Sequence, residues 1–241
     1  MIYGEILAGG KGNRMGNTEM PKQFLKLGDK PIIIHTLEKF VLCRKIDKII
    51  IVVPKQWKQH TIDIIKKYID MKTENRIYIC EGGVNRNESI MNGIRYINNH
   101  WGINDDDIVV THDSIRPFIT NRIIEDNIKM CLKYHATDTV IPAFDTIVES
   151  ENNDTITNIP VRNFMYQGQT PQSFNIKKLM GFYDSISEEE KEVLTDAAKI
   201  FVINGEKVRL VLGEVFNIKI TTQFDLKLAN ALVKEGSSND K

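Results

Sequence analysis

The sequence has few cysteines, no net charge and no long apolar run. Its three cysteines, Cys43, Cys80 and Cys131, follow no disulfide, metal-ligand or redox spacing, so we expect reduced thiols in a cytoplasmic protein. No segment reaches the roughly 18 apolar residues of a membrane span, and the N-terminus lacks the basic and apolar segments of a signal peptide. Lys and Arg together number 32, as do Asp and Glu, so no overall field attracts nucleic acid or a membrane surface. Any bound anion must therefore be held by a local cluster.

The chain does contain β-branched runs that alternate with amphipathic helical patterns. We predict strands at residues 2–7, 49–53, 76–80, 108–111 and 139–143. Helices are predicted between them, at residues 35–42, 57–69, 86–98 and 123–134. Such alternation, with about 30 residues per unit, is typical of right-handed βαβ crossovers. It predicts an α/β domain over residues 1–236 with a mostly parallel twisted sheet, whose ligands gather at the carboxyl ends of the strands.

The pattern changes over residues 144–175, where short polar and β-type pieces replace the long helices. We interpret this segment as a β-arm that protrudes from the core. Beyond it we predict further elements, which are helices at 177–183 and 188–199, a strand pair at 207–212 and 217–220, and a last helix from Phe224. Residues 237–241 form a polar tail that we expect to be disordered.

A glycine-rich turn, Gly9-Gly10-Lys11-Gly12-Asn13-Arg14, follows the first predicted strand. Glycines let backbone N–H groups approach a phosphate closely, and Arg14 and Lys22 add cations beside the turn. A flexible surface turn with solvated basic residues is the alternative interpretation. A dinucleotide site is excluded, because the glycines do not follow G-x-G-x-x-G and the second strand ends at Val53-Pro54-Lys55 without an acidic residue for the ribose.

The segment His112-Asp113-Ser114-Ile115-Arg116-Pro117 follows the fourth predicted strand. A carboxylate at a strand end can coordinate Mg²⁺, which keeps several waters and bridges to substrate phosphates. The alternatives are that Asp113 caps a turn and that His112 is a hydrogen-bonded core histidine. We favour the metal for Asp113 and the core interpretation for His112.

A second glycine pair, Gly82-Gly83, lies between the third strand and the next helix, with Ser89 near the helix start. Glycines and small polar residues can present backbone groups to a base edge. A simple turn with a helix N-cap explains the same residues equally well, so both interpretations stay open.

Seven motifs occur in one order along the chain, which are L-A-G-G-K-G-N-R-M-G, P-K-Q-F-L, G-G-x-x-R-x-x-S, H-D-S-I-R-P, D-T, T-P-Q and N-I-K-I-T. In this order they resemble the cytidylyltransferases that make CDP-methylerythritol and CDP-ribitol. The resemblance extends over essentially the whole chain. It implies a Rossmann-like, three-layer nucleotidyltransferase fold, CTP as a substrate, Mg²⁺ as cofactor, and a homodimer formed through the β-arm. An associated reductase is a further partner compatible with it.

The resemblance also implies roles for individual positions. Arg14, Lys22 and Lys219 are expected to be catalytic, and Asp113 to bind the metal. The positions expected to bind the nucleotide are Leu7, Ala8, Gly9, Gly10, Gly12, Gly82, Gly83, Arg86, Ser89 and Ser114. The positions expected to bind the acceptor are Arg116, Asp145, Thr146, Arg162, Gln167 and Thr170. Because Arg162 and Thr170 lie in the arm segment, we expect them to come from the neighbouring subunit.

Three stretches bear on the acceptor. Tyr166-Gln167-Gly168-Gln169-Thr170-Pro171-Gln172 is similar to the ribitol-phosphate enzymes, and His112-Asp113-Ser114-Ile115 departs from the H-D-A-A of the methylerythritol enzymes. Phe216 stands where the latter carry an acid. The resemblance therefore favours D-ribitol 5-phosphate, whose CDP derivative is a precursor of teichoic-acid or capsule polymers. The alternatives are the methylerythritol-phosphate enzyme of isoprenoid synthesis and a non-catalytic nucleotide sensor.

Overall fold

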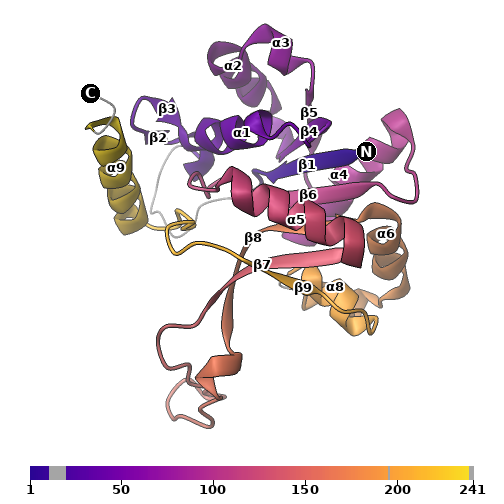
Figure 1. The fold of residues 1–241 in the computed structure, drawn as a ribbon, viewed down its shortest axis with the longest axis vertical. Helices are drawn as coiled ribbons and strands as arrows, with labels where there is room; N and C mark the ends of the chain where they lie inside the picture. The colour runs from indigo at the N-terminus through magenta and orange to yellow at the C-terminus, as the bar shows by residue number, and fades with distance from the viewer. Residues whose placement is uncertain (11–19, 195, 239–241) are drawn as a thin grey trace.

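A mixed β-sheet covered by helices on both faces forms the body of the molecule (Figure 1). The computed structural model describes residues 1–10, 20–194 and 196–238. Within these ranges seven strands form the main sheet, in the order β5-β4-β1-β6-β8-β7-β9. In chain order the strands are β1 (Ile2–Leu7), β4 (Lys48–Val53), β5 (Ile77–Glu81), β6 (Ile108–Asp113), β7 (Ala136–Pro142), β8 (Tyr166–Asn175) and β9 (Arg209–Leu212). A short hairpin joins β2 (Lys26–Leu27) to β3 (Lys30–Pro31).

The sheet is mostly parallel, which confirms the predicted fold class. Strands β5, β4, β1 and β6 run parallel, as do β7 and β9, whereas β8 runs antiparallel to both of its neighbours. The register places Leu7 beside Val52 on one side and Asp113 on the other. The carboxyl ends of β4, β1 and β6 therefore meet at one edge of the sheet.

Two hydrophobic clusters, one on each face, produce three layers. On one face the helices are α1 (Ile32–Leu42), α2 (Lys58–Tyr68) and α5 (Asn121–Tyr134). On the other face they are α4 (Arg86–Trp101), α6 (Ile176–Ser185) and α8 (Ala198–Ile203). The remaining helices are α3 (Met71–Glu74), α7 (Glu188–Glu192), α9 (Gln223–Ser238) and the 3₁₀ turns η2 (Lys22–Phe24), η3 (Lys55–Trp57) and η4 (Arg162–Phe164). No helix of the described ranges is long and apolar enough to cross a membrane.

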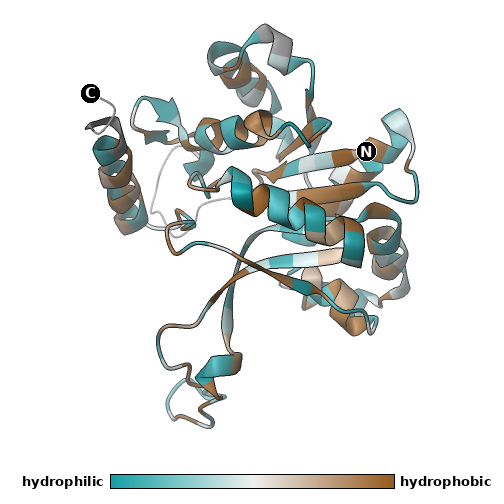
Figure 2. Cartoon of the chain, in the orientation of Figure 1, coloured by the Kyte–Doolittle hydropathy of each residue, from teal (hydrophilic) through white to brown (hydrophobic). Residues whose placement is uncertain are grey.

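The continuous β-branched run of β4 is explained by this layering. Residues 49–53 are fully buried, because helices cover both faces of the strand. Burying one such side chain contributes about 1.5–3 kcal/mol. Helix α5 is instead amphipathic, with apolar residues toward the sheet and hydrophilic residues outward (Figure 2). The three cysteines are buried and unpaired.

The arm is shorter than predicted. Strand β8 belongs to the main sheet, where it pairs with β6 and β7, so only the segment between Pro142 and Tyr166 protrudes (Figure 1). Gln172 and its neighbours in β8 are buried, because α-helices pack on this part of the sheet. The predicted arm of residues 144–175 thus included most of a core strand.

Three other predictions need correction. The helix predicted at 188–199 is two helices, α7 and α8, and the Asp196 carboxylate accepts a hydrogen bond from the N–H of Ala198 at the start of α8. Residues 217–220 form no strand, because their backbone hydrogen bonds go to a loop instead. The Ile220 N–H, for example, donates to the Ile115 carbonyl oxygen. Helix α9 continues to Ser238, into the predicted tail, while residues 239–241 lie outside the described ranges.

Candidate active site

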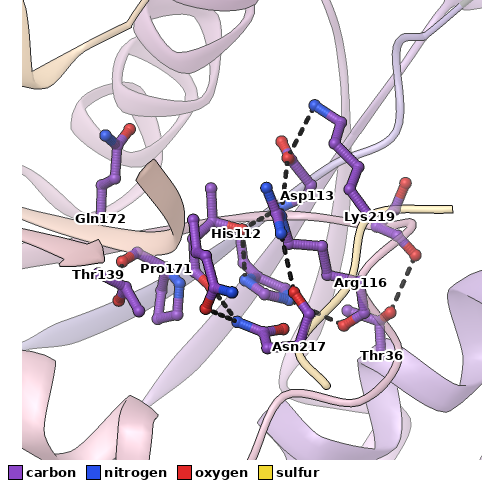
Figure 3. A network of polar contacts seen from close by, with 12 residues as sticks. Thr36, His112, Asp113, Arg116, Thr139, Pro171, Gln172, Asn217 and Lys219 are labelled. Atoms are coloured by element: carbon purple, nitrogen blue, oxygen red, sulfur yellow. Dashed lines mark hydrogen bonds and ion pairs between the residues drawn. The ribbon is translucent and has the colours of Figure 1, made fainter. Parts of the chain in front are cut away.

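Asp113, the last residue of β6, is surrounded by three cationic side chains. Lys219 Nζ lies 3.0 Å from its Oδ2 atom, and Arg116 Nε lies 3.5 Å from the same oxygen (Figure 3). Arg86 Nε, from the first residue of α4, lies 3.6 Å from Oδ1. These cations come from three separate segments of the chain, so the fold assembles them around one carboxylate.

The three cations determine the charge of this carboxylate. Burial alone would raise the pKa of Asp113, but the fields of Arg86, Lys219 and Arg116 outweigh it and hold the pKa well below its ordinary value. Asp113 is therefore ionised at neutral pH. The cluster carries an excess of positive charge, which suits an anionic ligand.

Arg86 keeps donors available beside Asp113. Its two terminal guanidinium nitrogens are buried and have no hydrogen-bond partner in the described part of the chain. Buried donors of this kind require an acceptor. Arg86 is thus placed to bind oxygen atoms of a ligand, as expected for a nucleotide-binding position.

A buried hydrogen-bond network holds the loop after β6. His112 Nε2 donates to the Arg116 carbonyl oxygen at 3.1 Å, and His112 Nδ1 accepts from the Thr170 hydroxyl at 2.8 Å. Thr170 Oγ1 in turn accepts from the Asp113 N–H at 3.2 Å. Burial lowers the pKa of His112 to about 4, so the ring is neutral. The interpretation of His112 as a satisfied core histidine is confirmed.

Asn217 fixes the position of the chain segment that carries Lys219. Its side-chain amide donates to the Thr170 carbonyl oxygen at 2.9 Å, and its own carbonyl oxygen accepts from Arg116 Nη1 at 2.8 Å. The residue is fully buried. Figure 3 shows Asn217 below Arg116, with Lys219 reaching over to Asp113. Asn217 therefore ties one predicted catalytic lysine to the β6 loop and to β8.

The two glycine segments meet at Ser89. The Ser89 hydroxyl accepts from the Gly83 N–H at 3.0 Å and donates to the Asn85 carbonyl oxygen at 2.8 Å. A Cβ atom on Gly82 would lie 3.1 Å from Ser89 Oγ, and one on Gly9 would lie 3.8 Å from it. Gly9 and Gly10 are exposed at the end of β1. The structure thus brings Gly9, Gly82 and Gly83 together at Ser89, four of the positions expected to bind the nucleotide.

The other predicted positions near β1 are also held in place. Gln23 Nε2 donates to the Ala8 carbonyl oxygen at 2.6 Å, and the Ser114 N–H donates to the Leu7 carbonyl oxygen at 3.0 Å. Lys22 lies next to Gln23 in η2 and is largely buried. The predicted residues Gly12 and Arg14 lie outside the described residues.

The arm positions are not brought to Asp113 within the chain. Asp145, Thr146, Arg162 and Gln167 are exposed, and Arg162 donates to the Phe144 carbonyl oxygen within the arm at 3.2 Å. Thr170, which the resemblance places on the arm, lies instead in β8 beneath Asp113 of its own chain. The expectation that a neighbouring subunit supplies Thr170 is therefore wrong, since its hydroxyl is bound within this chain.

Glu5 is a buried acidic residue that the sequence analysis missed. It lies in the middle of β1, and neither carboxylate oxygen has a hydrogen-bond partner among the described residues. Burial raises the pKa of Glu5 well above its ordinary value, and Arg86 opposes the shift. A Cβ atom on Gly93 of α4 would lie 2.1 Å from Glu5 Oε1, so a side chain there would displace the Glu5 carboxylate. The sequence did contain a signal for this site, because Glu5 is an acidic residue within a strand that was predicted to be buried.

Asp113 is the residue of this cluster that could hold a magnesium ion. The described residues contain no group of three or more His, Cys, Asp or Glu side chains that could hold a metal alone. Mg²⁺ is commonly bound by one or two carboxylates together with substrate phosphates and water. Asp113 supplies one ionised carboxylate, but Lys219, Arg116 and Arg86 lie 3.0, 3.5 and 3.6 Å from its oxygens, so an ion there would depend on substrate phosphates and water for most of its ligands.

The fold, with a cationic cluster at its strand ends, is that of a nucleotidyltransferase. Residues 3–235 match the family model described as IspD, 2-C-methyl-D-erythritol 4-phosphate cytidylyltransferase, and the chain belongs to this family.

Individual relatives agree with the family. The ribitol-5-phosphate cytidylyltransferase of Lactiplantibacillus plantarum is 59% identical over 98% of this chain and 100% of its own length. The structure of the 4-diphosphocytidyl-2C-methyl-D-erythritol synthase from Anaerococcus prevotii superposes with a TM-score of 0.78 at 28% identity, covering 97% of this chain and 96% of that one. The 2-C-methyl-D-erythritol 4-phosphate cytidylyltransferase of Francisella tularensis gives a TM-score of 0.78 at 27% identity, with 95% and 98% covered.

Proposed function

We propose that this protein transfers CMP from CTP to D-ribitol 5-phosphate, giving CDP-ribitol and pyrophosphate. The observation that carries the proposal is the 59% identity to a ribitol-5-phosphate cytidylyltransferase over 98% of the chain. Phe216, which stands where the resemblance places an acid in the methylerythritol enzymes, supports the same acceptor.

The reaction is an in-line displacement at phosphorus. An oxygen of the acceptor phosphate forms a bond to the α-phosphorus of CTP. The bond from that phosphorus to the bridging oxygen breaks, and this oxygen keeps the electron pair as pyrophosphate leaves. Because a phosphate monoester is largely ionised at neutral pH, no general base is needed. Catalysis is then a matter of positioning and charge stabilisation.

Each charged residue of the site has a part in this scheme. Arg86 and the glycine segments around Ser89 hold the nucleotide. Lys22, with Arg14, holds the α-phosphate and the charge that develops on it. Lys219, which reaches Asp113 from the segment fixed by Asn217, binds the acceptor phosphate and sets its angle of approach.

Magnesium is the cofactor of this proposal, and Asp113 is the residue that would hold it. The ion supplies charge neutralisation to the triphosphate when it is bound. Asp113 is ionised, and it pairs with Leu7 at the end of β1, the strand that leads into Gly9 and Gly10. Arg116 keeps the loop in place, since it contacts both Asp113 and Asn217.

The protruding arm is the dimerisation element of this proposal. Its apolar side chains are largely exposed, which on a monomer would leave an unusual apolar surface. They are Phe144, Val148, Ile156, Ile159, Val161, Phe164 and Tyr166. A second copy of the chain would cover them, and the arm would carry Asp145, Thr146 and Arg162 to the neighbouring acceptor pocket.

Pyrophosphate release from CTP and magnesium, measured with one acceptor at a time, tests the proposal. Ribitol 5-phosphate should support rapid release, and 2-C-methyl-D-erythritol 4-phosphate should support little. The reverse preference would assign the chain to the methylerythritol reaction. No release with either acceptor would favour a nucleotide-binding protein without this activity.

A further inference from the structure

Two carboxylates outside the Asp113 cluster share one amide group. Gln172 Nε2 donates to Asp138 Oδ1 at 3.0 Å and to Asp196 Oδ1 at 2.6 Å. Asp138 lies in β7, Gln172 lies in β8, and Asp196 directly precedes the start of α8. Gln172 is fully buried, whereas both carboxylates are partly exposed. The amide therefore fixes two partly exposed acidic groups relative to each other.

This pair lies on the same face of the sheet as Asp113. Gln172 is paired with Asp138 on one side and with Thr111 on the other. Thr111 precedes Asp113 by two residues, and side chains two apart along a strand share a face. Figure 3 shows Gln172 and Asp113 extending to the same side. The charges of Arg86 and Arg116, which flank Asp113, also act on Asp138.

One acceptor of this array lacks a donor. Gln172 Oε1 is buried without a hydrogen-bond partner in the described part of the chain, whereas the Asp196 carboxylate also accepts from the Ala198 N–H at 2.7 Å. Burial, followed by the charge of Asp196, raises the pKa of Asp138 to about 7. The partner that Gln172 Oε1 lacks is a hydrogen-bond donor, and two neighbouring acidic side chains disfavour a negatively charged one. A phosphate dianion has no hydrogen to donate and adds negative charge, whereas the hydroxyl groups of a polyol donate hydrogen bonds and are neutral.

We propose that Asp138 and Asp196, oriented by Gln172, bind hydroxyl groups at the end of the acceptor remote from its phosphate. The inference rests on the proposed function and deepens it, because it assigns the residues that select a linear polyol chain. The cationic cluster at Asp113 would hold the phosphate end, and the acidic pair would hold the polyol end.

The test compares two acceptors that differ by one hydroxyl-bearing carbon, ribitol 5-phosphate and erythritol 4-phosphate. Wild-type enzyme should prefer the longer acceptor in kcat/KM. Asp138→Asn keeps the shape of the side chain but weakens it as an acceptor. It should lower kcat/KM for ribitol 5-phosphate roughly 10- to 100-fold, the range for a hydrogen bond to a charged group. With erythritol 4-phosphate the variant should match wild type, and its KM for CTP should be unchanged.

Two further variants make the result decisive. Asp196→Asn should give the same loss of discrimination between the two acceptors. Asp105→Asn removes an exposed carboxylate paired with Lys177 and should leave discrimination intact. An equal loss with both acceptors would show that Asp138 has only a structural role and would overturn the inference. Failure of the proposed function is distinguishable, because wild-type enzyme would then not use ribitol 5-phosphate at all.

Discussion

Lys219 and Asp113 form an ion pair of 3.0 Å between segments more than a hundred residues apart in the sequence. The lysine side chain is 38% exposed and the aspartate side chain 10% exposed. The ammonium group is thus held at the edge of the site by a buried carboxylate. The ammonium group of Lys219 is therefore paired with a carboxylate and still accessible to solvent.

Lys219→Ala should impair turnover rather than CTP binding. Removing one preorganised donor that stabilises the developing charge typically lowers kcat by about 10²- to 10³-fold. The measurement is pyrophosphate release at saturating CTP and varied acceptor. Lys177→Ala, which removes a surface ion pair, is the matched control and should leave kcat unchanged. Near-normal turnover of Lys219→Ala would contradict its catalytic role.

Removal of divalent cations should abolish activity. Chelation with EDTA is expected to stop pyrophosphate release, and excess Mg²⁺ should restore it, because the triphosphate charge needs neutralisation. Asp113→Asn should require a higher Mg²⁺ concentration for half-maximal activity than wild type. Full activity of wild-type enzyme in EDTA would refute the magnesium proposal.

The proposal that the arm of one subunit completes the acceptor pocket of its neighbour predicts complementation between two inactive variants. Arg162→Ala would damage the arm contribution, and Lys22→Ala would damage the nucleotide side. Mixed subunits should regain activity, since a heterodimer contains one site with both residues intact. Activity is measured after co-expression with two different tags and isolation of the heterodimer. Absence of recovery in that heterodimer would mean that each site is formed within one chain.

Stability should depend on pH through Asp138. Its pKa is about 7 in the folded protein against an ordinary value of 3.8, so the folded state binds more protons between these values. The free energy of unfolding therefore falls as pH rises from about 4 to about 7.

Asp138→Asn should remove this dependence. The melting temperature of the variant should exceed that of wild type at pH 8, by about 2–4 °C for each kcal/mol recovered, and the difference should shrink at pH 5. Differential scanning calorimetry at both pH values measures it. Parallel pH profiles for the two proteins would show that Asp138 does not titrate in this range.

Local sequence patterns were sufficient to predict the parallel part of the sheet. The run at 49–53 and the strand-end position of Asp113 follow from periodicity alone, because each strand is short and bounded by turn residues. The glycine segments around Ser89 were also located, although only the structure brings Gly9 and Gly82 to the same hydroxyl group.

Contacts between distant segments were not predictable in this way. Strand β8 carries polar residues such as Gln172 and Thr170, which in a sequence indicate exposure. They are buried because their partners, among them His112 and Asp138, lie on neighbouring strands. The sequence analysis therefore extended the arm too far, to residue 175, and so included most of β8.

The two strands that support the arm, β7 and β8, also carry Asp138, Thr170 and Gln172, which belong to the proposed acceptor site. Any shift of the arm relative to the body would have to pass through the pairing of Asp138 with Gln172 and through the bond from Thr170 to His112. In this proposal, subunit association and acceptor selection depend on the same two strands. An engineer who shortens or grafts this arm must preserve the alignment of both strands, or the specificity of the enzyme will change along with its assembly.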